Sequence, residues 1–104
     1  MPGQRTSVVK DIHALLAQDP ALTPLDTVED VLTAGYAQAL ALEAQQLRLE
    51  RRLWQLTRER DAASNDAAAA DELNQRLYEV ESELAYLRSV LVTLRDRARE
   101  LRAA

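Results

Sequence analysis

The most regular pattern in this chain is a repeat of apolar residues in its C-terminal third, spaced at alternating steps of four and three. The positions are Leu73, Leu77, Val80, Leu84, Leu87, Leu91, Leu94, Ala98 and Leu101. Such a repeat places one apolar seam along a helix, and a partner helix must cover that seam, as in a coiled coil. We therefore predict a long C-terminal helix whose seam forms a helix–helix interface.

A second long helix is predicted over residues 25–62. One apolar stripe should face the seam and contains Val28, Leu32, Gly35, Ala39, Leu42, Leu49, Leu53 and Leu56, with Gln46 as an interruption that sets the register. A further stripe contains Tyr36, Leu40, Leu47 and Trp54. Because a helix that is apolar on two sides needs two neighbours, we expect this stripe to form a second interface. Gly35 is costly inside a helix and indicates either a close helix crossing or a kink.

The remaining segments are short. Residues 1–6 read as a tail, and apolar residues at helical spacing predict a helix over 7–18 that Asp19 and Pro20 end. Thr23 and Pro24 suit the N-cap and first turn of the next helix. The polar stretch 63–66 is the break between the two long helices, with Asn65 or Asp66 as the cap of the second.

Two long helices joined by a short break predict an antiparallel hairpin. The chain has 104 residues, of which 29% are charged, with only two Gly and three Pro, which is typical of long helices. We therefore expect an all-α protein with a tail and short helix over 1–24 and a coiled-coil hairpin over 25–104. Because a hairpin buries little on its own, we expect a homodimer that forms a helical bundle.

Composition and charge narrow the classes of function. The net charge of −4 argues against direct DNA binding, and the absence of cysteine excludes disulfides. No apolar run approaches the roughly 20 residues that span a bilayer, and no signal-peptide core is present, so we expect a cytoplasmic protein. The clustered arginines alternate with acidic residues, which favours ion pairs on a solvated helix face over docking on an acidic partner or phosphate.

Candidate chemistry is sparse. His13, the single histidine, stands beside Ile12 on the short helix, where a structural role is far more common than catalysis. The chain lacks the Glu-x-x-His pairs of bundle di-metal sites, so no metal site is predicted. A small helical enzyme of the chorismate mutase type needs inward-pointing Arg and Lys, but Lys10 is the only lysine and lies outside the long helices. We predict a protein without enzymatic activity.

One further group of candidate functional residues lies beside the apolar seam. Glu81, Ala85, Arg88, Val92 and Asp96 are spaced four, three, four and four residues apart, so they share one side of the helix. No acidic residue stands three or four positions from Arg88, so its counter-charge must come from another helix, a ligand or solvent. The simplest interpretation is a row of mostly polar residues that borders the apolar coiled-coil seam and separates it from solvent.

The segment 79–102 resembles the signature helix of the RsiG-type anti-sigma factors of actinobacteria. Their motif, E-x3-S-x2-R-x3-Q-x3-D on a Leu- and Arg-rich helix, is matched by Glu81, Arg88 and Asp96. Ala85 stands where that family has serine, and Val92 where it has glutamine. The resemblance implies an antiparallel hairpin that binds a sigma factor when a cyclic-di-GMP dimer is bound against it; members with one motif copy act as homodimers.

By the same resemblance, Arg88 would contact guanine or phosphate, and Glu81 and Asp96 would accept hydrogen bonds from guanine. Ala85 and Val92 offer no polar group, and losing two such contacts would cost about a hundredfold in affinity. A relative that holds its partner without the nucleotide, or through a changed signal, is an equal alternative. A structural coiled-coil scaffold that homodimerises and binds no nucleotide is the other hypothesis.

Overall fold

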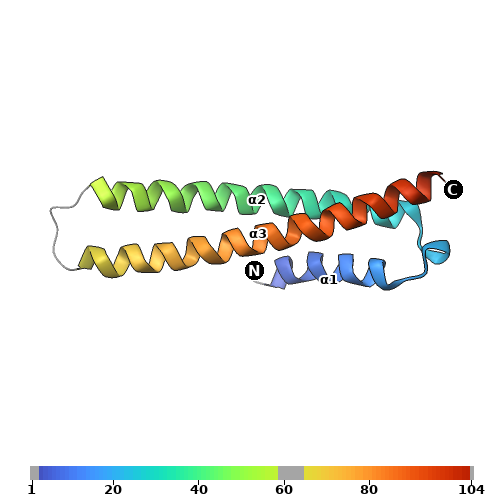
Figure 1. The fold of residues 1–104 in the computed structure, drawn as a ribbon, viewed down its shortest axis with the longest axis horizontal. Coiled ribbons are helices and arrows are strands. Elements are labelled where there is room, and N and C mark those ends of the chain that lie inside the picture. Colours follow the sequence, from blue (N-terminus) through green and yellow to red (C-terminus); the bar gives the residue numbers. More distant parts are fainter. Residues whose placement is uncertain (1–2, 59–64, 104) are drawn as a thin grey trace. The chain divides into compact units, whose positions relative to one another are not determined.

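The structure, a computed structural model, describes residues 3–58 and 65–103. Its elements are the helix α1 (Gly3–Ala17), a single 3₁₀ turn η1 (Pro20–Leu22), and the long helices α2 (Leu25–Arg58) and α3 (Asn65–Ala103). Figure 1 shows their order along the chain, from α1 in blue to α3 in yellow to red. The described residues contain no strand, and the prediction of an all-helical protein with two long, mutually packed helices is confirmed.

The chain divides into two compact units, to both of which α2 and α3 contribute. The first unit comprises 1–40 and 85–104, and the second comprises 41–84. α1 and η1 belong to the first unit, together with parts of α2 and α3. An N-terminal segment of this length gains little from helix propensity alone, so packing against longer helices is its main source of stability.

The core of the first unit draws on three helices. Its buried apolar residues are Ile12 and Leu15 of α1, Val28, Leu32 and Ala39 of α2, and Leu87, Leu91, Leu94 and Ala98 of α3. In this unit α2 and α3 run antiparallel, because Glu29 contacts Arg102 whereas Gly35, further along α2, lies against Leu91. The second unit buries Leu42 and Leu49 of α2 and Val80 and Leu84 of α3.

The connection between α1 and α2 differs in detail from the prediction. The carboxylate of Asp19 caps η1 by accepting a hydrogen bond from the Ala21 N–H at 3.0 Å. Thr23 is buried, and its hydroxyl donates to the carbonyl oxygen of Asp19 at 2.9 Å. Because α2 begins at Leu25, the residue directly before the helix is Pro24 and not Thr23. The first intrahelical bond of α2 runs from the Val28 N–H to the carbonyl oxygen of Pro24.

Helix boundaries also shift slightly. α1 begins at Gly3 instead of residue 7, since Gln4 and Arg5 are good helix formers. α2 ends at Arg58 among the described residues, so its predicted extension to residue 62 lies outside them. Residues 63 and 64 of the predicted break fall outside the described range, whereas Asn65 and Asp66, its other two residues, already belong to α3.

Gly35 allows α3 to approach α2 closely. A Cβ atom at this position would overlap the side chain of Leu91 and would lie 3.7 Å from Cδ1 of Ile12. Of the two expectations for this glycine, the close crossing is therefore the one observed.

Substitution of Gly35 by alanine is expected to destabilise the protein in spite of alanine's better helix propensity. The propensity gain is about 1 kcal/mol, whereas overpacking a filled core costs about 1–3 kcal/mol. In a Leu91→Ala background the overlap is relieved, so Gly35→Ala should then stabilise. Urea unfolding of the four proteins of this double-mutant cycle measures the change of sign. An equal effect of Gly35→Ala in both backgrounds would contradict the close contact.

Candidate functional site

The stripe singled out in the sequence reaches solvent in the first unit. Ala85, Arg88, Val92 and Asp96 are all exposed on α3, and Val92 keeps 46% of its surface accessible. These residues therefore do not serve the core of this unit. A partly exposed valine between charged residues gives α3 a mixed apolar and charged surface, which we call the α3 stripe.

The position of α1 leaves this stripe uncovered. Tyr86 Oη and His13 Nε2 lie 2.7 Å apart, and their rings meet edge to face with centroids 5.9 Å apart. Arg97 donates to the carbonyl oxygen of Gln18 at 3.5 Å. Because each residue turns an α-helix by about 100°, Tyr86 points roughly 160° away from Arg88 when measured the short way round. The residues of α3 that hold α1 therefore lie on a different side of the helix from the α3 stripe.

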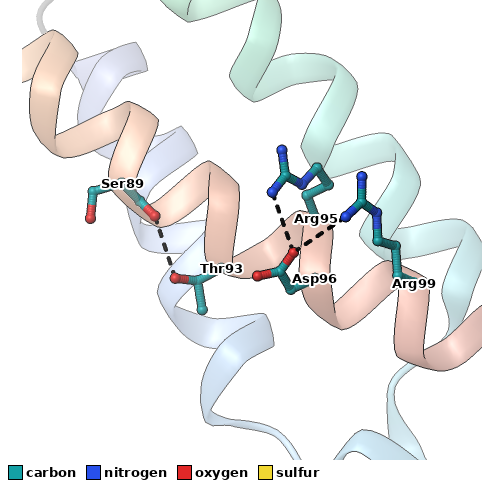
Figure 2. A network of polar contacts seen from close by, with 5 residues as sticks. All are labelled: Ser89, Thr93, Arg95, Asp96 and Arg99. Atoms are coloured by element: carbon teal, nitrogen blue, oxygen red, sulfur yellow. Dashed lines mark hydrogen bonds and ion pairs between the residues drawn. The ribbon is translucent and has the colours of Figure 1, made fainter.

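Asp96 is the charged residue of the stripe whose partners are defined. Its Oδ1 lies 3.4 Å from Nη2 of Arg95 and 4.0 Å from Nη1 of Arg99. Figure 2 shows the guanidinium groups of Arg95 and Arg99 both directed at this carboxylate, with Thr93 about one turn and Ser89 about two turns earlier in the helix. All three side chains are substantially exposed, so each pair contributes at most about 1 kcal/mol. The cluster presents two cations around one anion.

Arg88 is exposed and is engaged by another group within the chain, although no acidic residue stands one turn away on its own helix. It lies eight residues before Asp96, a separation of about 12 Å along the helix axis. The structure therefore brings Arg88 and Asp96 onto one accessible surface without joining them directly.

Glu81 belongs to the second unit. Its Oε2 accepts a hydrogen bond from Nε2 of Gln46 at 3.3 Å, which links α3 to α2 within that unit. Gln46, expected from the sequence to set the register, thus has a polar partner across the helix pair. The structure gives Glu81 a bond within the chain, and a ligand that used this carboxylate would compete with Gln46.

The predicted interface residues fall into two groups. Val80, Leu84, Leu87, Leu91 and Leu94 are buried, whereas Leu73 and Leu77 are half-buried. Leu40, in the first unit, is exposed, and so are Leu47 and Trp54, in the second. The stripe that the sequence assigned to a further neighbour is therefore uncovered in the single chain.

Some contacts were not foreseen from the sequence. The His13–Tyr86 pair joins residues far apart in the chain, and no periodic pattern signals it. Arg102 of α3 forms an ion pair with Glu29 of α2 at 2.6 Å. The sequence had predicted only local ion pairs, between residues of the same helix. The Nε atom of Arg95 is buried without a hydrogen-bond partner, although its guanidinium tip reaches Asp96.

Within residues 3–58 and 65–103, no three His, Asp or Glu side chains gather in a way that could hold a metal ion. No helix in the same part of the chain is long and apolar enough to cross a membrane. No protein-family model, curated protein or solved structure matches this chain. The function must therefore be argued from the α3 stripe itself.

Proposed function

We propose that this chain is a non-enzymatic regulatory protein of the RsiG type, which binds a sigma factor through the α3 stripe in the cytoplasm. The observation that carries the proposal is the exposure of Arg88, Val92 and Asp96 together on one side of α3, a side different from that of Tyr86, which holds α1. Arginine is enriched at protein interfaces and among the residues that contribute most to binding.

The side chains present suit a protein partner better than a nucleotide. Ala85 and Val92 are exposed and offer apolar surface but no hydrogen bond. Arg88 supplies a planar, forked donor for a carboxylate or a phosphate of the partner. Cyclic-di-GMP, if it takes part, would rely on Arg88 and Asp96 in the first unit, because Ala85 and Val92 cannot contribute polar contacts.

A scaffold protein that binds no nucleotide is the second candidate. It is favoured by the pairing of Asp96 with Arg95 and Arg99, and by the bond of Glu81 to Gln46, since these charges already have partners within the chain. The two candidates differ in what Arg88 does: in a scaffold its removal leaves partner binding unchanged.

Introducing the serine and glutamine of the family motif at positions 85 and 92 tests directly whether the chain binds cyclic-di-GMP. The double variant Ala85→Ser with Val92→Gln is expected to bind cyclic-di-GMP about a hundredfold more tightly than the natural sequence, because each new hydrogen bond contributes about 0.5–1.5 kcal/mol. Both positions are exposed, so stability should change little. Isothermal titration calorimetry of the two proteins measures the difference.

The control is the same double variant with Arg88→Ala, which should lose the gained affinity. No heat of binding from any of these proteins, at millimolar nucleotide, would remove cyclic-di-GMP from the proposal. Binding by the double variant that survives Arg88→Ala would place the nucleotide elsewhere on the protein.

A further inference from the structure

A second accessible surface lies on α2 in the second unit, on a different helix from the α3 stripe. Leu47 and Trp54 keep 60% and 58% of their surface accessible, whereas Leu49, between them in the sequence, is buried. Side chains two residues apart on a helix point about 160° from each other, so Leu47 lies on the side of α2 away from the core of this unit. Trp54, one heptad further along, lies on nearly the same side.

Arginines stand beside these two apolar residues on one side of the helix. On a helical wheel, the sector of α2 that runs from Trp54 round to Arg48 covers about 120°. Within residues 41–58 this sector contains no acidic residue, and all of its residues are exposed. Its large side chains, which we call the basic aromatic surface, are those of Leu47, Arg48, Arg51, Trp54 and Arg58.

The arginines of the basic aromatic surface are available to a partner. Among residues 3–58 and 65–103, the side chains of Arg48 and Arg51 take part in no ion pair or hydrogen bond. The guanidinium carbon of Arg58 lies 4.5 Å from the centroid of the Trp54 ring, a cation–π contact that orients the ring. The exposed carboxylate of Glu50 stands about 40° beyond Trp54 on the wheel, outside this surface.

We propose that the basic aromatic surface binds an acidic amphipathic helix of a partner protein. Leu47 and Trp54 are one heptad apart, about 10 Å along the axis, which matches the spacing of leucines on a helix that packs beside α2. Carboxylates on the flank of that helix would meet Arg48 and Arg51, since a guanidinium group binds a carboxylate through two parallel hydrogen bonds. Tryptophan and arginine are also the residues that most often dominate the binding energy of protein interfaces.

Charge and apolar area favour this occupant over a membrane or a nucleic acid. The surface presents only two large apolar side chains, whereas a helix that lies in a bilayer interface needs a broad apolar face. The whole chain carries a net charge of −4, which opposes long-range attraction to a nucleic acid. An acidic helix, by contrast, can pair with the arginines at short range and cover Leu47 and Trp54 at the same time.

Trp54 is the only tryptophan in the chain, so its fluorescence reports on this surface directly. The probes are two designed helical peptides without tryptophan. Both have one line of leucines at heptad spacing, which is flanked by glutamate in the first peptide and by lysine in the second. Titrated into the full-length protein at about 0.1 M salt, the glutamate peptide should shift the Trp54 emission to shorter wavelength and bind at least about tenfold more tightly than the lysine peptide.

Reversing two charges of the surface should reverse the preference between the peptides. The double variant Arg48→Glu with Arg51→Glu is expected to bind the lysine peptide about tenfold more tightly than the glutamate peptide. The matched control is Lys10→Glu with Arg76→Glu, which changes the net charge by the same amount at two exposed positions outside the surface. This control should keep the preference for the glutamate peptide. Circular dichroism confirms that the helices are intact in both variants.

Equal affinity for the two peptides, or an unchanged preference in Arg48→Glu with Arg51→Glu, would overturn the proposal. A larger emission shift with phosphatidylglycerol vesicles than with the glutamate peptide would also overturn it, because a membrane would then cover Trp54. Emission that changes with the concentration of the protein alone would assign the surface to a second copy and overturn it as well. Arg88→Ala, on the α3 stripe, should leave peptide affinity unchanged, so this proposal and the proposed function can fail independently.

Discussion

Replacement of Leu87 by aspartate is expected to unfold the first unit. Leu87 is 2% exposed in a core built from α1, α2 and α3. Truncation of a buried leucine alone costs about 2–5 kcal/mol, and an unpaired buried carboxylate adds several kcal/mol more. The total stability of a small protein is only about 5–15 kcal/mol, so this one change removes most or all of it.

Thermal melting followed by circular dichroism measures the effect, with protein concentration held fixed because dimerisation would shift the midpoint. The matched control is Val92→Asp on the same helix, which introduces the same charge at a position that is 46% exposed. This control should shift the melting temperature only slightly. A cooperative transition for Leu87→Asp near that of the natural protein would contradict the described core.

The second large effect is expected on binding rather than on stability. Arg88 is exposed on the α3 stripe, so replacing it by alanine should leave the fold intact. A central arginine of a protein interface typically contributes 2 kcal/mol or more, so Arg88→Ala should weaken sigma-factor binding by about a hundredfold. Arg76→Ala is the matched control, because Arg76 is also an exposed arginine of α3 but lies outside the stripe.

Much of the fold could be predicted because its core repeats along the chain. Leu87, Leu91 and Leu94 follow the heptad spacing, and any helix with that spacing must bury them. Gly35 stood out because glycine is unfavourable inside a helix, and it occupies a close contact with Leu91. The exposed Leu47 and Trp54 were likewise visible as a second stripe that the hairpin does not use.

The remaining features depend on contacts that no local pattern encodes. Tyr86 meets His13 only because α1 packs beside α3 in the first unit. The Thr23 hydroxyl bonds the carbonyl oxygen of Asp19 across the η1 turn, a contact that the sequence did not indicate. Spacing along a helix determines on which side of the helix a side chain lies, but not which side chain of another element it contacts. The partners of functional side chains are therefore harder to predict than their positions.

The most direct test of the α3 stripe is a titration of the purified chain with the proposed partner, a sigma factor of its own organism, with and without cyclic-di-GMP. The stripe predicts binding by the natural protein and by Arg76→Ala, and a loss of about a hundredfold for Arg88→Ala. No binding by the natural protein under either condition, or equal affinity for all three proteins, would contradict it.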